Sequence, residues 1–328
     1  MNDPESPEFV LAADLGGTNA RVAAVARDGT ILTSARGATP SNEGPSEIVA
    51  ELVRLAEESC GRNGSQKMPI AFGLAVPALV DSANGKIVSS PNLPQMNDVG
   101  LSEAISTACG IPAVLENDAN AAAVGENWLG ASNGVATSIC VTLGTGVGGG
   151  IILDGEVWRG IDGTAAEIGH ICVEPNGVFC GCGSRGCVEQ YSSATAVVRI
   201  ARELARDFPG SALSSIDAFT ARDVFLAARE GDSLALEVFR LSGMYLGIAL
   251  AGLVNTLNPE AIVIAGGAAA GWEMFVHHVR SEIDKRAFRR PAERVKLVPA
   301  QLGDAAGILG SARLAFDAHP QGSVSSNR

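Results

Sequence analysis

The residues with the most specific chemistry lie in the run HICVEPNGVFCGCGSRGC. Three thiolates and one imidazole form the donor set of a closed tetrahedral zinc site, and here they are His170, Cys180, Cys182 and Cys187. Glycines between the cysteines let the chain turn tightly around an ion, and Cys172 is an alternative for one ligand. Because four protein ligands leave no open position for water, the sequence predicts a structural zinc ion.

Two glutamates, Glu167 and Glu189, flank this run. If zinc holds one ring nitrogen of His170, the other N–H stays available for a ligand hydroxyl. A carboxylate pair beside such a histidine suits a polyol, although each glutamate is alternatively a solvated loop residue. The isolated residues Cys60, Cys109 and Cys140 are expected in the core, and His277, His278 and His319 are given no role.

Two glycine-rich turns follow apolar runs at equivalent places. In DLGGTNAR the residues of interest are Asp14, Gly16, Gly17, Thr18 and Asn19, and in LGTGVGGG they are Gly144, Thr145 and Gly146. Glycines let backbone N–H groups approach phosphate oxygens. Neither turn has the Walker ending, and one such turn alone is usually only a hairpin. Two of them favour a site that holds a triphosphate from both sides.

The segment ENDAN, residues 116–120, joins an apolar run to the alanine-rich stretch AAAVGENW. Asn117 or Asp118 at such a junction is typical of a helix N-cap. A carboxylate at the end of a strand, opposite phosphate-binding turns, is also well placed to accept the proton of an attacking hydroxyl. The sequence therefore predicts Asp118 as a general base, with the helix cap as the alternative.

The elements that must position these residues repeat one plan. Residues 9–36 and 136–159 each contain an apolar run, a glycine turn, a second run, an Asp-Gly turn and a third run. Each run is typical of a β-strand and each Asp-Gly of a hairpin. Mixed strands and helices follow both repeats, which indicates an internal duplication with two α/β lobes and a cleft between them.

The chain length of 328 residues agrees with two lobes, because lobes of roughly 150 residues each are a common size. We expect the first lobe over residues 9–130 and the second over 131–317, with a zinc-binding insertion at 170–187. We expect the closing helix over 304–317. An alternative for this helix is to pack on the first lobe.

Composition limits the class of protein and its partners. Hydrophobic residues at 46%, charged residues at 18% and 39 glycines are typical of a soluble α/β protein. A formal net charge of −12, without an evident basic cluster, disfavours nucleic acid and membrane surfaces. The N-terminus has no secretion-signal pattern, so we expect a cytoplasmic protein. The polar ends, 1–8 and 318–328, are predicted to be disordered.

One uncharged stretch, Leu241 to Pro259, is long enough to cross a membrane. Gly243 and Gly247 within it have the spacing of membrane helix dimers. Polar residues such as Asn255 dilute its hydrophobicity, which favours a helix buried against a sheet instead.

Taken in order, DLGGTNAR, ENDAN, LGTGVGGG, EIGH, CGCGSRGCVEQYSSATA and the late AGG make nearly the whole chain resemble the ROK family of sugar kinases and repressors, and within it the bacterial glucokinases. The resemblance implies the actin-like ATPase (ribonuclease H-like) fold, with ATP bound between two lobes. It also implies transfer of phosphate from ATP to the 6-hydroxyl of a hexose, glucose to glucose 6-phosphate, and a homodimer.

The same resemblance implies roles for single residues. Asp118 is then the base, and Asp14 lies near Mg²⁺. The implied sugar contacts are Asn92, Asn117, Asp118, Glu167, His170 and Glu189. The implied ATP contacts are the two glycine-rich turns together with Gly266 and Gly267, at the adenosine.

Three alternatives stay open. N-acetylmannosamine, N-acetylglucosamine and fructose are other substrates of kinases in this family. A sugar-sensing repressor is expected to carry an N-terminal DNA-binding domain, for which a first strand beginning at about Phe9 leaves no room. A non-catalytic ATP-driven scaffold is disfavoured by the predicted zinc-braced polyol pocket.

Overall fold

A computed structural model of the protein describes residues 7–63 and 67–320. The chain divides into two compact units. Unit 1 comprises Met1–Gly130, Arg159–Ala165 and Asp304–Arg328, and unit 2 comprises Ala131–Trp158 and Ala166–Gly303. The closing helix therefore belongs to unit 1, and so does a short loop that we expected in the second lobe.

The chain ends are described only in part. The predicted disordered segments fall mostly on residues 1–6 and 321–328, which lie outside the described residues. Within the described part, the last helix continues to Ala318, one residue beyond its expected end.

Unit 1 is built on a sheet with the strand order β3-β2-β1-β4-β7. Its strands are β1 (Phe9–Leu15), β2 (Asn19–Ala26), β3 (Ile31–Ala38), β4 (Phe72–Val76) and β7 (Ala113–Asn117). The first three form an antiparallel meander, and β4 and β7 run parallel to β1. A separate hairpin consists of β5 (Leu79–Asp81) and β6 (Lys86–Ser89). The parallel strands all end at one edge of the sheet.

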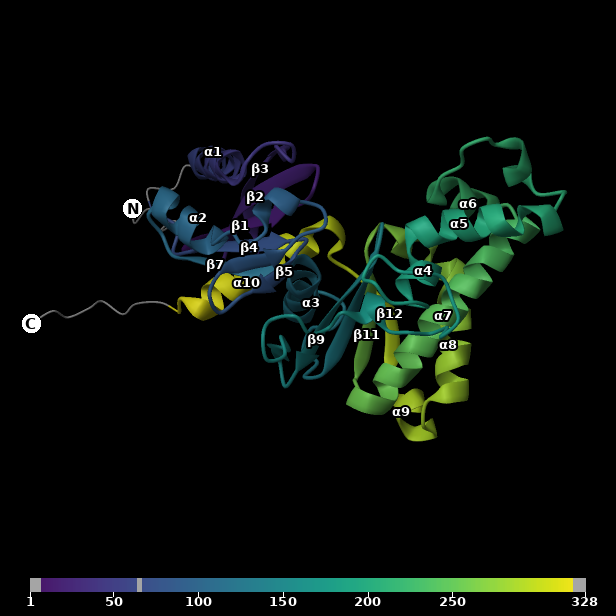
Figure 1. Cartoon of the computed structure of the whole chain (residues 1–328). Helices are drawn as coiled ribbons and strands as arrows, with labels where there is room; N and C mark the ends of the chain where they lie inside the picture. Colours follow the sequence, from purple (N-terminus) through teal and green to yellow (C-terminus); the bar gives the residue numbers. More distant parts are fainter. Residues whose placement is uncertain (1–6, 64–66, 321–328) are drawn as a thin grey trace, which may run out of the picture. The chain divides into compact units, whose positions relative to one another are not determined.

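Helices cover both faces of this sheet (Figure 1). On one face α1 (Pro45–Asn63) and α2 (Leu101–Cys109) bury large side chains against the strands. On the other, α3 (Asp118–Leu129) and α10 (Ala306–Ala318) approach small residues. A Cβ at Gly73 of β4 would lie 1.9 Å from the carbonyl oxygen of Ser311. The absence of a side chain at Gly73 therefore permits the close packing of α10 on this sheet.

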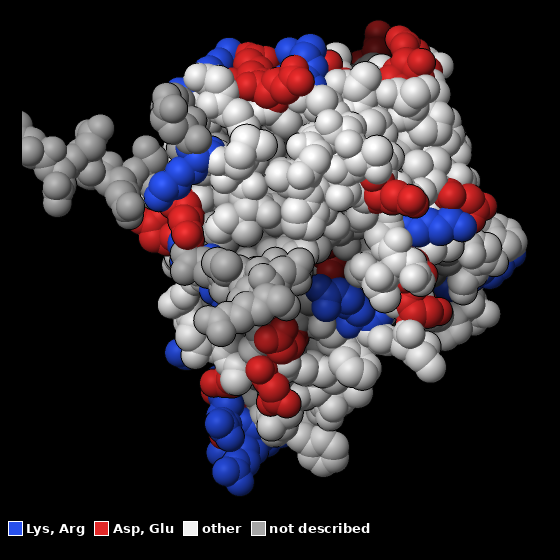
Figure 2. Space-filling view, turned by 90° about the vertical axis from the view of Figure 1, so that its left-hand side faces the viewer, with Lys and Arg blue, Asp and Glu red and all other residues white. Residues whose placement is uncertain are grey.

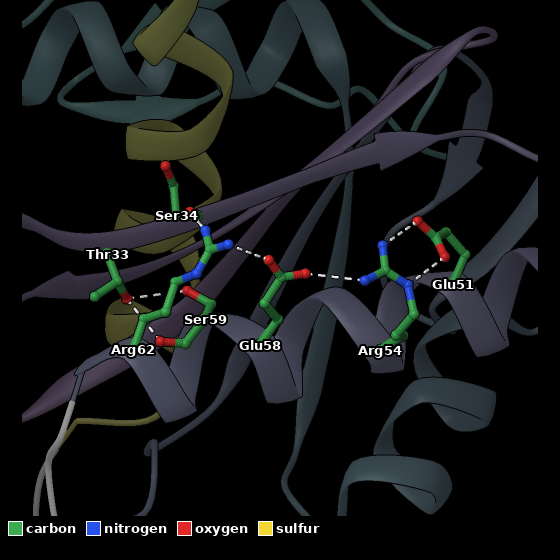
Figure 3. A network of polar contacts seen from close by, with 7 residues as sticks. All are labelled: Thr33, Ser34, Glu51, Arg54, Glu58, Ser59 and Arg62. Atoms are coloured by element: carbon green, nitrogen blue, oxygen red, sulfur yellow. Dashed lines mark hydrogen bonds and ion pairs between the residues drawn. The ribbon is translucent and has the colours of Figure 1, made fainter.

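Polar contacts join α1 to the edge strand β3 (Figure 3). Thr33 Oγ1 donates to the carbonyl of Ser59 at 2.8 Å. Arg54 binds Glu51 through two hydrogen bonds of 2.8 and 2.7 Å and reaches Glu58 at 2.9 Å. Because these charges are exposed, each pair contributes only about 0–1 kcal/mol to stability.

Unit 2 repeats the sheet of unit 1, with the order β10-β9-β8-β11-β12. Its strands are β8 (Ser138–Leu143), β9 (Val147–Leu153), β10 (Glu156–Val157), β11 (Ala261–Ala265) and β12 (Lys296–Pro299). Again three antiparallel strands are followed by two strands parallel to the first. The predicted α/β fold with two units of related topology is confirmed.

The helices of unit 2 surround a long apolar one, α7 (Ser233–Leu257). The others are α4 (Glu189–Ser192), α5 (Ala194–Leu204), α6 (Ala221–Arg229), α8 (Trp272–Arg286) and α9 (Arg289–Arg294). By length and composition α7 is the one described helix able to cross a membrane, and 61% of its apolar window is buried inside the protein. Cβ atoms at Gly243 and Gly247 would lie 2.7 and 2.8 Å from backbone oxygens of α8. The membrane-like glycine spacing therefore serves helix packing within unit 2.

Acidic and basic side chains form small interspersed groups on the face drawn in Figure 2. The expectation of no basic cluster is wrong for one segment, which contains Lys285, Arg286, Arg289, Arg290, Arg294 and Lys296. Lys285 and Arg286 both pair with Glu282, at 2.8 and 2.7 Å, and Arg289 pairs with Glu293 at 2.7 Å. Part of this positive charge is thus neutralised locally.

Candidate active site and metal centre

One histidine and three cysteines form the candidate metal centre of unit 2. His170, Cys180, Cys182 and Cys187 offer donor atoms that all lie within 4.8 Å of one another, and Cys172 is not part of the group. The Sγ atoms of Cys182 and Cys187 are 3.6 Å apart, and His170 Nδ1 lies 3.6 Å from Cys180 Sγ. Zinc–sulfur bonds of about 2.3 Å in a tetrahedron place the sulfurs about 3.8 Å apart, so the four groups fit a zinc ion.

Tight turns bring the sulfur atoms together. Gly183 and Gly186 have φ angles of +90° and +68°, which glycine adopts without strain. Cys180 and Cys187 are buried, whereas Cys182 is exposed. Burial, followed by hydrogen bonds with Cys182 and Cys180 that favour the protonated thiol, raises the pKa of Cys187 to about 12. A cation bound among these sulfurs would oppose this shift and favour the thiolate.

His170 presents its two ring nitrogens to different partners. Nδ1 faces the metal-donor group, and Nε2 lies 3.8 Å from Oε2 of Glu167. Burial raises the pKa of Glu167, His170 opposes this shift, and Glu189 adds to it. Glu189 Oε2 accepts from the N–H of Val147 at 3.1 Å, and its Oε1 lies 3.8 Å from Cys180 Sγ. An imidazole with two nearby carboxylates offers the donors and acceptors that vicinal hydroxyls require.

The glycine-rich turn between β8 and β9 contacts the start of α5. The N–H of Ala194 donates to the carbonyl of Gly144 at 2.8 Å, and Thr195 Oγ1 donates to that of Thr145 at 2.8 Å. The turn itself is closed by the Gly144 N–H, which donates to Gly146 at 3.0 Å. A helix N-terminus beside a glycine turn attracts anions, so this turn suits phosphate.

The second glycine turn of unit 2 follows β11 at the same sheet edge. Gly266 has a φ of +87°, and a Cβ there would lie 2.4 Å from the carbonyl oxygen of Leu143 at the end of β8. A Cβ at Gly267 would meet nothing within 4 Å. The sheet thus brings both predicted ATP-binding turns of this unit side by side.

The surroundings of Gly144 and Gly146 change the effect that we expect from a substitution at Gly146. From sequence alone, a bulky residue at Gly146 should weaken ATP binding more than sugar binding. A Cβ at Gly146 would, however, lie 2.5 Å from Oε2 of Glu189, whereas one at Gly144 would meet nothing within 4 Å. We expect Gly144→Ala to raise the KM for ATP alone by about tenfold, which is ~1.4 kcal/mol, and Gly146→Ala to raise the KM for the sugar as well. Steady-state kinetics would contradict this placement if both variants changed both constants equally.

In unit 1, Asn117 and Asp118 stand where β7 ends and α3 begins. Asn117 Oδ1 accepts from the N–H groups of Ala119 and Asn120 at 2.9 and 3.1 Å, so Asn117 is the N-cap. Its Nδ2 donates to the carbonyl of Ala78 at 3.1 Å, which leaves a second N–H for a ligand. Asp118 is therefore the first helical residue and not the cap, although its Oδ1 also accepts from Ala119 at 2.8 Å.

The turn between β1 and β2 is held by hydrogen bonds. The N–H of Gly16 donates to Asn19 at 2.8 Å, and Thr39 Oγ1 donates to the carbonyl of Gly16 at 2.7 Å. A Cβ at Gly17 would lie 3.4 Å from the Cβ of Asn92, so the predicted sugar-binding Asn92 contacts the predicted phosphate turn. Within the turn, the side chains able to donate hydrogen bonds are exposed, and they are Thr18 and Asn19.

Asp14 has an acidic neighbour, Asp304, that no local sequence pattern indicates. Burial raises the pKa of Asp14, Arg21 opposes this shift, and Asp304 adds to it. A Cβ at Gly307 would lie 3.5 Å from the Asp14 carboxylate, so the start of α10 lies against it. An acidic residue just before a helix is typical of an N-cap, so the sequence around Asp304 does not indicate a ligand site. Its effect on Asp14 follows from the packing of α10 on β1. Two carboxylates near one another suit Mg²⁺.

Strand register gathers the candidate residues within each unit. In unit 1 Asp14 is level with Ala75 of β4, which is level with Glu116 of β7, so the turn after β1 and Asp118 lie at one edge. In unit 2 Thr142 of β8 is level with Ala265 of β11. Ligands bind at the carboxyl ends of parallel strands in α/β sheets. Each unit therefore presents its candidate residues where this rule expects them.

Two units that repeat one sheet order, with glycine-rich turns at the carboxyl edges, define the class of actin-like ATPases and sugar kinases. The profile of the ROK family matches residues 10–318, and the chain belongs to this family.

Relatives in this family include kinases and repressors. The chain is 35% identical to the glucokinase of Thermotoga maritima, over 93% of this chain and 96% of the relative. It is 32% identical to the xylose repressor of Bacillus subtilis, over 76% of this chain and 61% of that protein. The crystal structure of a ROK family glucokinase from Streptomyces griseus in complex with glucose and AMPPNP is 35% identical and has a TM-score of 0.80, covering 94% of this chain and 99% of that one.

Proposed function

We propose that this protein is an ATP-dependent hexose kinase that phosphorylates the 6-hydroxyl of glucose. The proposal rests mainly on the two contacts of the Glu189 carboxylate. One carboxylate oxygen accepts from the N–H of Val147, next to the phosphate-type turn, and the other lies against Cys180 of the metal-donor group. One side chain therefore links the predicted hexose-binding groups to the predicted phosphate turn of unit 2.

Each group has a defined task in this reaction. Asp118 accepts the proton of the attacking hydroxyl, and the backbone N–H groups of the glycine turns hold the phosphates. Asn92, Asn117, Glu167, His170 and Glu189 orient the hexose. The carboxylates of Asp14 and Asp304 suit a site for Mg²⁺, which neutralises phosphate charge when it is bound.

The four-donor group suits zinc in a structural role. His170, Cys180, Cys182 and Cys187 would hold the ion, which supplies folding energy and no reactive water. With Nδ1 fixed in this way, His170 carries its remaining proton on Nε2 and can donate it to a sugar hydroxyl. The hexose site is then rigid before the sugar arrives.

Glucose is favoured over other sugars by the glucokinase relatives. N-acetylmannosamine, N-acetylglucosamine and fructose are the other candidate substrates, because they differ from glucose mainly at the first two carbons. The presence of repressors among the relatives keeps sugar sensing as the second candidate function. We further propose a cytoplasmic homodimer.

A sugar panel tests the proposal. Purified protein is assayed with ATP and each of these four sugars, and ADP release is followed by a coupled reaction. We expect glucose to have the largest kcat/KM. A larger value for another sugar would assign that sugar as the substrate, and binding of sugar without ADP release would favour the sensing function.

A further inference from the structure

Glu116 is a buried carboxylate that the proposed reaction does not use. It is only 1% exposed and directly precedes Asn117 and Asp118. Its Oε1 accepts from the N–H of Asn117 and from Nδ2 of Asn120, both at 3.0 Å, and lies 3.4 Å from the hydroxyl of Ser82. Because a buried charge is costly unless it is paired and hydrogen-bonded, the partners of Glu116 indicate its role. These partners fix the first turn of α3.

The positive partner of Glu116 comes from a loop far away in the sequence. Nε of Arg159 donates to Oε2 of Glu116 at 2.6 Å. Arg159 begins the strap, residues 159–165, which belongs to unit 1 although the chain on both sides belongs to unit 2. The N–H of its last residue donates to the carbonyl of its first at 3.2 Å. A Cβ at Gly163 would lie 2.3 Å from the carbonyl oxygen of Val80, so the strap lies directly on β5.

The strap leads straight into the hexose-binding segment. Ala166 follows it with a φ of +66°, a left-handed conformation that a residue other than glycine keeps only when its surroundings enforce it. Glu167 comes next, within roughly 8 Å of chain from the end of the strap. His170 begins the metal-donor group three residues later. The anchored strap therefore limits where Glu167 can lie.

We propose that Glu116 and Arg159 are positioning residues, which fix the start of α3 and the chain that leads to Glu167 as one element. Asp118, the predicted base, follows Glu116 by two residues, and Glu167, a predicted hexose contact, follows the end of the strap by two residues. This inference rests on the proposed kinase function. Arginine suits the task because its planar guanidinium donates in a fixed direction, which the flexible ammonium of lysine does not reproduce.

The alternative role for this ion pair is stability alone. Removing one member leaves a buried or half-buried charge without its partner and destabilises a protein strongly, whereas replacing both members is often neutral. A double variant therefore separates the two roles. If the pair only stabilises unit 1, Glu116→Gln combined with Arg159→Met will restore both melting temperature and turnover. If the pair positions the reacting groups, only the melting temperature will recover.

The kinetic experiment compares Arg159→Met, Arg159→Lys, the double variant and a control. Arg54→Met is the control, because Arg54 also binds two acidic residues of unit 1 but lies on the exposed face of α1 (Figure 3). We expect the double variant to melt near the wild-type temperature with kcat reduced by about 10- to 100-fold and the KM for ATP nearly unchanged. Arg159→Lys should recover little of the turnover. Wild-type turnover in the double variant would overturn the proposal.

Hydrogen exchange of the whole chain tests positioning without any activity. Peptides that cover residues 113–121 and 163–171 should exchange at least several-fold faster in the double variant than in the wild type, and Arg54→Met should leave both unchanged. Unchanged exchange in both peptides would overturn the proposal even if the protein is a kinase. If no sugar supports ADP release, the kinase assignment fails, and the exchange result still decides whether the ion pair holds the two segments.

Discussion

Asp118→Asn should lower the turnover number by at least about a hundredfold, because general bases typically contribute on the order of 10²- to 10⁴-fold. A sugar hydroxyl is a poor nucleophile, and its proton must leave as the phosphoryl group arrives. Asparagine keeps the size of aspartate but accepts no proton. The cap of α3 is unaffected, since Asn117 provides it. Sugar affinity measured by calorimetry should change far less than kcat.

Asp98→Asn is a matched control for this variant. Asp98 is an exposed carboxylate of the same unit with a φ of +63°, a conformation that asparagine also tolerates. It should leave the turnover number unchanged. If Asp118→Asn retains more than about a tenth of wild-type turnover, the base lies elsewhere, and Glu167 is the next candidate.

Cys182→Ser should release the metal and lower kcat/KM for the hexose by about a hundredfold, which corresponds to ~2.7 kcal/mol. A hydroxyl is a much poorer zinc ligand than a thiolate, and loss of the ion frees His170 to rotate away from its hexose-binding position. The melting temperature should fall as well. Denatured wild-type protein should release about one zinc ion per chain, measured by a chromogenic chelator.

Cys172→Ser is the control for Cys182→Ser, because it removes a thiol from the same run without removing a member of the four-donor group. Cys172 is exposed and faces Cys187 across a backbone bridge, but its sulfur is outside the four-donor group. This variant should keep the zinc and the activity. Wild-type protein that is fully active without metal would contradict the proposed role of the zinc ion.

Much of the fold follows from local patterns. The two Asp-Gly turns and the apolar runs around them predict both antiparallel meanders, and the related sheet orders confirm the duplication. Helix α2 is not predicted by its local sequence, because its nine residues, LSEAISTAC, include serine, threonine and isoleucine, which are poor helix formers. Its stability comes from packing: Leu101 and Ile105 are buried in the core of unit 1. Tertiary contact of this kind is not visible in a local pattern.

Some groups of the candidate site are likewise predicted by local spacing, whereas others form only through tertiary contacts. The four candidate zinc ligands are close in sequence, so their spacing alone predicts the group of donor atoms that the structure forms. The pairing of Glu116 with Arg159 spans 43 residues, and no local signal points to it. Asp304 contributes to the raised pKa of Asp14 only because α10 packs with unit 1. The roles of the individual site residues stay predictions.

Phosphoryl transfer to hexose is tested most directly by product analysis of the wild-type protein with ATP, Mg²⁺ and glucose. We expect phosphorus NMR to show one glucose 6-phosphate formed for each ADP, with ADP release that depends on the sugar and is nearly absent in Asp118→Asn. ADP release at the same rate with and without sugar, or sugar binding without any phosphorylated product from the whole panel, would contradict the account.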